Sequence, residues 1–221
     1  AYILFRGLGR DAGVIEGESF RYDLDEAKRV SPEIVIAREV DSLGTGFEST
    51  RGIAVGPDDT IYVVGDRAIV ALEDGKPARR TELPAAPVCV TTDADGTVYV
   101  ASTNRVFKLA EATLPGGWEA LPGEAYITSL AASDEAVFVA DAGQRTVWRF
   151  DPAGRLLGRI DERPDGGDGP AFFIPSPSFD VALGTDGSFW VVDPGRHTVK
   201  NYKARGDFIG SWGRAGMDAA G

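Results

Sequence analysis

Residues 90–101, VTTDADGTVYVA, form the stretch that decides the fold. Two short runs rich in β-branched residues flank Asp95-Gly96, a pair that accepts the positive φ of a tight hairpin turn. Three other stretches have the same layout of strand, acidic turn and strand: residues 52–64, GIAVGPDDTIYVV; residues 130–140, LAASDEAVFVA; and residues 181–192, VALGTDGSFWVV. The sequence therefore predicts four copies of one β-hairpin.

The four hairpins share their turn chemistry and one aromatic position. The other turns are Asp58-Asp59, Asp134-Glu135 and Asp186-Gly187, and the aromatic that follows each turn is Tyr62, Tyr99, Phe138 or Trp190, 37, 39 and 52 residues apart. A spacing of about 40 to 50 residues is typical of propeller blades. We expect these rings to fill equivalent layers between neighbouring blades, with a ligand-binding aromatic stripe as the alternative.

Two further strands follow each hairpin. Third strands with an alternating pattern are predicted at residues 68–72, 105–109, 146–150 and 198–203, and more polar outer strands at 76–83, 118–122, 155–160 and 207–212. No long apolar pattern with helical periodicity occurs. The predicted fold is all-β, a β-propeller of four-stranded antiparallel blades at about residues 51–83, 88–122, 127–160 and 179–213.

Several motifs carry a family resemblance over residues 44–216. The run DAGQRTVWRFDPAGRLLG at 141–158 resembles the NHL repeat, and DPGRHTVKNY at 193–202 and the bridge GGDGPAFFIP at 166–175 are similar to it. In the first two blades, Gly65 and Ser102 stand where the later blades have Asp141 and Asp193. The resemblance implies a propeller, whereas the activities found on such folds differ widely.

Both ends of the chain suggest an incomplete ring. Residues 33–40 are predicted to be a closing strand, residues 1–31 an N-terminal extension or tether, and residues 32–221 the propeller, whose C-terminal remainder is expected beyond residue 221. We expect a six-bladed ring that needs roughly 80 to 90 further residues at about 40 per blade. A closed ring of four blades is the alternative.

Charge and composition restrict the partners. The formal net charge of −11 argues against DNA binding and disfavours RNA binding, because proteins that bind the phosphate backbone use dense Lys and Arg. The single cysteine, Cys89, excludes an intrachain disulfide framework. Membrane association through the N-terminus or a partner stays open, and the compartment is not assigned, with an extracytoplasmic or membrane-associated location slightly favoured.

The predicted inner strands offer little chemistry. They contribute one thiol, Cys89, and one carboxylate, Asp180, so we assign no catalytic residue, metal ligand or cofactor. Cys89 is interpreted as a small buried apolar residue and His197 as a turn residue. The acidic cluster at residues 165–169 lacks the ligand spacing of a calcium loop and is interpreted as a bridge between blades.

One set of side chains is a candidate ligand site. The predicted loops between second and third strands, together with the start of the first inner strand, carry basic residues: Arg51, Arg67, Arg105, Arg145, Arg196 and His197. A ring of this kind would suit a carboxylate-rich peptide or another anionic group. The structural alternative is that these arginines pair with the repeat's own aspartates, as Arg145 could with Asp141.

These observations favour a non-enzymatic propeller that binds a protein partner or acts as a scaffold, for example as an accessory subunit of a larger assembly. The alternative is a propeller lyase or lactonase whose channel metal is completed by further blades. Binding of single-stranded RNA is a third hypothesis.

Overall fold

The computed structural model describes residues 37, 39–109, 117–166, 171–176 and 178–214. The chain divides into two compact units, Ala1–Ser42 and Leu43–Gly221. The predicted N-terminal extension and most of the predicted closing strand lie outside the described residues, so both stay predictions. Everything that follows concerns the second unit.

Within this unit the described regular structure is almost entirely β-strand. Each sheet is antiparallel and its strands pair in sequence order. We call the sheets blades one to four. Their strands are β1 (Thr50–Val55), β2 (Ile61–Gly65), β3 (Ala68–Glu73) and β4 (Lys76–Glu82); β5 (Cys89–Thr92), β6 (Val98–Ala101) and β7 (Val106–Leu109); β8 (Ile127–Ala132), β9 (Val137–Asp141), β10 (Thr146–Phe150) and β11 (Leu156–Ile160); β12 (Val181–Leu183), β13 (Phe189–Asp193), β14 (Thr198–Tyr202) and β15 (Phe208–Trp212).

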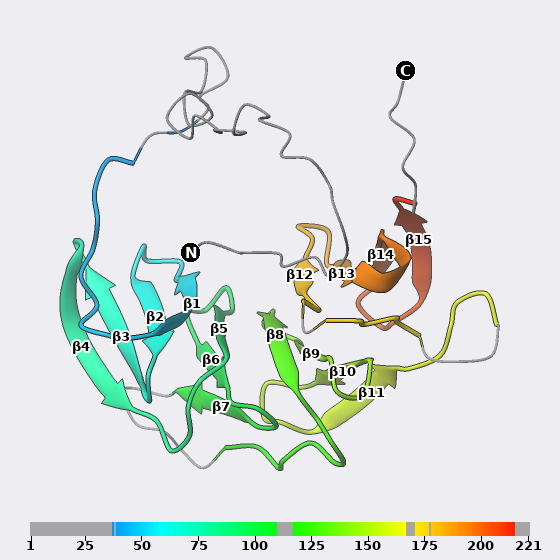
Figure 1. Ribbon diagram of the computed structural model, residues 1–221, viewed down its shortest axis with the longest axis horizontal. Helices are drawn as coiled ribbons and strands as arrows, with labels where there is room; N and C mark the ends of the chain where they lie inside the picture. Colours follow the sequence, from blue (N-terminus) through cyan, green and yellow to red (C-terminus); the bar gives the residue numbers. More distant parts are fainter. Residues whose placement is uncertain (1–36, 38, 110–116, 167–170, 177, 215–221) are drawn as a thin grey trace, which may run out of the picture. The chain divides into compact units, whose positions relative to one another are not determined.

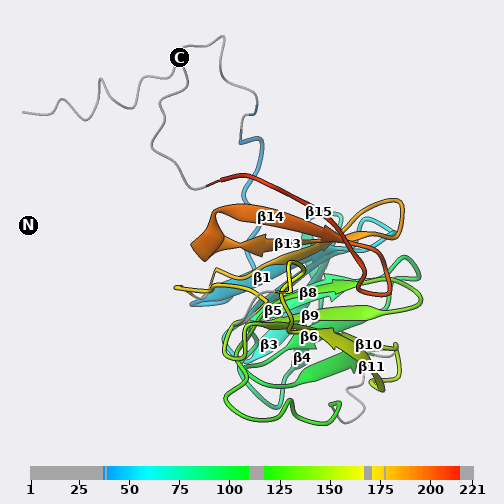
Figure 2. The ribbon, with the colours of Figure 1, turned by 90° about the vertical axis from the view of Figure 1, so that its right-hand side faces the viewer.

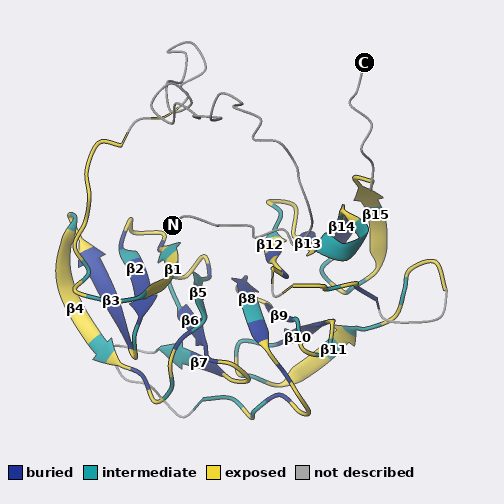
Figure 3. Ribbon diagram, viewed as in Figure 1, coloured by how far each residue is buried: buried dark blue, intermediate teal, exposed yellow. Residues whose placement is uncertain are grey.

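The blades follow one another round an arc, with the first strand of each blade towards the centre (Figure 1). β1 contacts β5, β5 contacts β8, and β8 contacts β12, so the inner strands are neighbours in chain order. Figure 2 shows the strands of blade four above those of blade three. The middle strands are the most buried and β4 is almost fully exposed, as expected for outer strands that meet water (Figure 3).

The prediction of a fourth strand at residues 118–122 is wrong. Among the described residues, blade two has three strands, although the segment still runs beside β7, with Trp118 N–H donating to the Val106 carbonyl at 2.9 Å. Two features disfavour a regular strand. Gly117 passes so close to Phe107 that a Cβ would lie 2.6 Å from that ring, and the Trp118 side chain packs between Tyr99 and Phe150.

The repeated aromatic position is an inter-blade layer in three blades. Tyr62, Tyr99 and Phe138 are each buried in a cluster that includes residues of the following blade, which confirms the packing interpretation for them. Trp190 occupies the same register in blade four, but it is half-buried and lies against Trp212 with ring centroids 4.9 Å apart. The face of blade four that carries Trp190 therefore differs from the other three.

The hairpin turns agree with prediction in three blades. Asp59, Gly96 and Gly187 have φ of 62°, 81° and 78°, which is the left-handed region that Gly and Asp tolerate best. The turn at Asp134-Glu135 contains no positive φ among its described residues. There the Ser133 hydroxyl accepts from the backbone N–H of Ala136 at 3.1 Å and holds the turn instead.

Candidate functional site: the bridge face

Each blade has a loop between its second and third strands, and these loops lie beside the segments that lead into the blades. The loops are residues 66–67, 102–105, 142–145 and 194–197. We call the edge formed by these loops and the entering segments the bridge face. Because the inner strands are neighbours and every sheet pairs in the same order, all four loops belong to one edge of the array.

At three of these loops, a carboxylate in the loop or in the residue directly before it binds the segment that enters the same blade. Asp66 accepts from the N–H of Ser49 at 3.0 Å, Asp141 from that of Tyr126 at 2.8 Å, and Asp193 from that of Phe173 at 2.9 Å. The comparison of the four repeats placed Gly65 at this position and missed Asp66. The β2–β3 loop is shorter than the corresponding loops of blades three and four. Its carboxylate therefore comes one residue later in the repeat and still binds the backbone of the segment that enters blade one.

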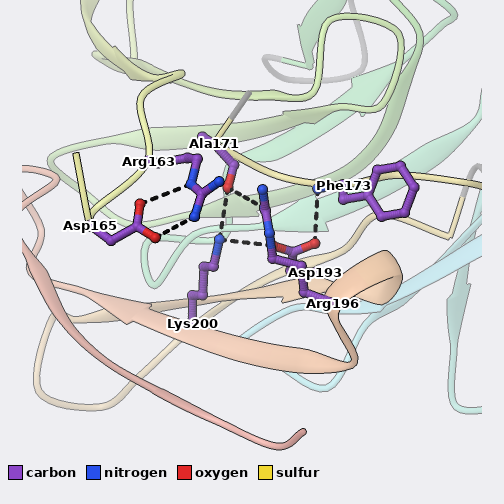
Figure 4. A network of polar contacts seen from close by, with 7 residues as sticks. All are labelled: Arg163, Asp165, Ala171, Phe173, Asp193, Arg196 and Lys200. Atoms are coloured by element: carbon purple, nitrogen blue, oxygen red, sulfur yellow. Dashed lines mark hydrogen bonds and ion pairs between the residues drawn. The ribbon is translucent and has the colours of Figure 1, made fainter. Parts of the chain in front are cut away.

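Asp193, which is fully buried as Asp141 is, is paired with two cations (Figure 4). It has no solvent-exposed surface and accepts from Lys200 Nζ and from Arg196 Nη1, each at 2.8 Å. Both cations also donate to the Ala171 carbonyl, at 2.7 Å and 2.9 Å. The network fixes residues 171–173 against blade four and leaves the buried charges paired.

The same contacts set the titration of Asp193. Burial alone would raise the pKa of this carboxyl, but hydrogen bonds from Lys200, Arg196 and the Phe173 N–H lower it below the ordinary value. A depressed pKa in the folded state stabilises the fold above the unfolded-state pKa of about 3.9, and this stabilisation disappears as pH falls through the lower folded value.

We therefore expect the contribution of Asp193 to be complete at pH 7 and smaller at pH 3, which lies below the unfolded-state pKa. The measurement is the difference in free energy of unfolding between the unaltered chain and Asp193→Asn, taken from urea titrations at both pH values. A difference that is as large at pH 3 as at pH 7 would show that the paired charge does not stabilise the fold.

Five of the predicted basic residues lie in the bridge-face loops and the sixth, Arg51, lies in β1; a ligand-binding role for them stays a prediction. Arg196 is committed to Asp193, which is the structural alternative, and His197 lies in a turn with φ of 54°. Arg67 donates to the Pro84 carbonyl at 2.6 Å. Arg51 lies in an irregularity at the start of β1, where the register shifts between Thr50 and Gly52.

Arg105 and Arg145 are exposed. Arg145 has φ of 57° and directly precedes β10, the same place that His197 has before β14. The ion pair suggested between Arg145 and Asp141 is replaced by Gln144, whose Nε2 donates to the Asp141 carboxylate at 2.8 Å. The guanidinium of Arg145 is thus not needed to hold the loop.

The inner strands show a different chemistry. Burial, followed by the nearby charge of Asp180, raises the pKa of Cys89 to about 12, so the thiol stays protonated at neutral pH and is a poor nucleophile. Asp180 is engaged by the Ser129 hydroxyl and by the N–H of Val181. Within the described residues, no three His, Cys, Asp or Glu side chains are grouped so that they could hold a metal ion. The same residues include no helix with the length and hydropathy of a membrane span.

The fold defined by these sheets is that of the β-propeller proteins. Solved structures similar to this chain include a streptogramin B lyase (TM-score 0.58, 14% identity, 77% of this chain and 56% of that chain). A second is a catalytically inactive virginiamycin B lyase from Staphylococcus aureus with Quinupristin (TM-score 0.54, 15% identity, 72% of this chain and 54% of that chain). A third is the hydrazine synthase of Kuenenia stuttgartiensis (TM-score 0.57, 13% identity, 79% of this chain and 52% of that chain). The chain thus spans about half the length of these proteins.

At these identities the similarity shows the fold alone, and it confirms the prediction of an all-β propeller. No family model matches the chain, so the NHL resemblance stays a prediction. No curated protein matches it either.

Proposed function

We propose that the chain is a non-enzymatic propeller module whose bridge face binds a carboxylate-rich segment of a protein partner. The observation that carries the proposal is the repeated placement of basic side chains in equivalent loops, of which Arg105 and Arg145 are exposed on adjacent blades. These cations stand out on a chain whose formal net charge is −11.

The scaffold suits this role. The bridge-face loops are short and hydrogen-bonded to the entering segments, so their guanidinium groups are presented by a rigid sheet array. Guanidinium groups bind carboxylates through paired hydrogen bonds, and each exposed pair contributes little by itself. Several such contacts, spread over two or more blades, would give a specific complex that weakens with salt.

The test is a calorimetric titration with an amidated peptide of about twelve residues rich in Asp and Glu. The double variant Arg105→Glu/Arg145→Glu is expected to weaken binding by about tenfold or more, which corresponds to roughly 1.4 kcal/mol. The matched control is Arg79→Glu/Arg155→Glu, which makes the same charge change on β4 and on the β10–β11 turn, outside the bridge face. Equal affinities for the two double variants would contradict the proposal.

The alternative enzyme hypothesis is tested separately. Two of the structural neighbours are lyases, and a lyase or lactonase of this fold would need a channel metal completed by further residues. A stoichiometric zinc or calcium ion in the purified protein would contradict the non-enzymatic proposal. Salt-sensitive binding of single-stranded RNA that is lost in Arg105→Glu/Arg145→Glu would favour RNA as the partner.

A further inference from the structure

One face of blade four meets solvent although the same face is buried in the other blades. We call it the forward face. In blade four it carries Trp190, Val192, Val199 and Trp212, which the register of β13, β14 and β15 places on one side of the sheet. Val192 and Val199 are each 36% exposed, and Trp212 is 51% exposed. Blade four therefore presents an apolar sheet surface to water.

The same two valine positions are buried in blades one to three. The side chains there are at most 3% exposed, and they are Val64 and Ile69, Ala101 and Val106, and Ala140 and Val147. Each pair belongs to an apolar cluster that also contains residues of the following blade. The forward face is thus the surface on which the next blade packs, and no blade follows blade four within the described residues.

The following blade contributes its opposite face, which we call the back face. One back-face position on the inner strand is Val90, Leu130 or Val181 in blades two to four, and each is at most 8% exposed. Ile53 has this position in blade one and is 66% exposed, and Val55 beyond it is 57% exposed. Blades one and four lie at the two ends of the arc (Figure 1), so the chain exposes both halves of one repeated interface.

A polar position on the forward face supports the same interpretation. In blade two this position is Lys108, whose Nζ donates to the Pro152 carbonyl of blade three at 3.5 Å. Asn201 has the equivalent register in blade four, and its buried Oδ1 has no hydrogen-bond partner among the described residues. Buried acceptors without a partner are rare in native proteins. Asn201 therefore offers an acceptor at a place where another blade bonds to the sheet that covers it.

We propose that the forward face of blade four binds the back face of blade one of a second copy, so that two chains meet as consecutive blades do within one chain. A second copy is the occupant because this chain itself carries the kind of surface that covers a forward face elsewhere. The contact joins two different surfaces, so it closes into a ring if the rotation between copies allows it and otherwise gives an open chain. Neither half includes Arg105 or Arg145, so the inference does not rest on the proposed function.

The forces at this contact differ from those at the bridge face. The apolar side chains that meet are uncharged, whereas each copy has a formal net charge of −11 and repels the other at long range. Salt screens this repulsion and leaves apolar burial intact. We therefore expect association that is unchanged or tighter at high salt, which is the opposite of the behaviour expected for the acidic peptide.

The contact is small on the blade-one side. Residues of β2 and β3 there pack against Phe47 of the entering segment, whereas Ile53 and Val55 of β1 stay exposed for the second copy. A small contact of this kind gives weak association. We expect the chain to be monomeric at the low concentrations of an unfolding titration and to associate above roughly 50 μM.

Sedimentation velocity of the unaltered chain between roughly 5 and 500 μM is expected to show a mass that rises with concentration. Val192→Glu/Val199→Glu blocks blade four and Ile53→Glu blocks blade one, and each is expected to lower the association constant by about tenfold or more. An equimolar mixture of these two variants is expected to regain association, because each supplies the half that the other lacks. Leu156→Glu is the matched control, since it puts the same charge on an exposed position of β11, outside both faces.

A mass of one chain across the whole range would overturn the proposal. So would self-association that Ile53→Glu retains, because two blade-four faces would then pair with each other, and so would a mixture that stays monomeric when each variant alone has lost association. A second readout needs no change in blade four. Quenching of tryptophan fluorescence by acrylamide is expected to fall with concentration as Trp212 is covered, and to stay constant in Ile53→Glu. Constant quenching in the unaltered chain would contradict the contact.

Discussion

Replacing Asp193 by asparagine is expected to lower the free energy of unfolding by about 3 to 5 kcal/mol at pH 7. The carboxylate is fully buried and is the shared acceptor of Lys200 and Arg196. Lys200 is only 6% exposed, so in the variant its ammonium would stay buried beside a neutral amide in place of a carboxylate. The loss of one member of such a pair leaves a buried charge without compensation, which costs more than the pair contributes when it is intact.

Urea unfolding followed by circular dichroism measures this effect through the midpoint and the slope of the transition. The control is Asp95→Asn, because Asp95 is an exposed acidic residue of the β5–β6 turn and its replacement should change stability by less than about 0.5 kcal/mol. A change below about 1 kcal/mol for Asp193→Asn would show that the entering segment is held by backbone contacts and not by the charged network.

The second large loss of stability is expected when Phe138 is replaced by alanine. The same replacement at Trp190, the equivalent position of blade four, is expected to cost less. The two residues have equivalent registers in blades three and four, but Phe138 is 1% exposed and Trp190 is half-buried. Phe138 lies 4.3 Å from Phe189 of the next blade, measured between ring centroids. Phe138→Ala removes a ring from a packed layer and should cost about 3 to 5 kcal/mol.

Trp190→Ala should cost considerably less, about 1 to 2 kcal/mol, because its main ring contact is Trp212, which is 51% exposed. The measurement is again the free energy of unfolding in urea, with both variants in the same buffer. Equal losses for the two variants would mean that the Trp190 face of blade four is covered in solution as completely as that of blade three.

The strands and hairpins could be predicted from the sequence because they depend on local patterns. The third strands at residues 68–72 and 146–150 match β3 and β10 closely, since alternation and turn residues specify short antiparallel strands. The same kind of pattern wrongly predicted a strand at residues 118–122. Their irregular path is imposed by the close approach of Gly117 to Phe107 and by the inward packing of Trp118, and neither contact is visible in a local pattern.

The candidate site could be predicted only in part. Five of the six basic residues lie in the predicted loops, since loop position follows from strand order, and Arg51 lies in β1. Their partners did not follow from the sequence: Gln144 and not Arg145 binds Asp141, and Asp66 replaces the aspartate missing at residue 65.

The central claim is that the bridge face binds a carboxylate-rich protein segment, and the most direct test is a titration of the unaltered chain with the acidic peptide at low and high salt. The account predicts saturable binding with one peptide per chain, and an affinity that falls by about tenfold between roughly 50 and 300 mM salt as the charges are screened. An absence of binding at low salt, or an affinity that does not change with salt, would contradict it.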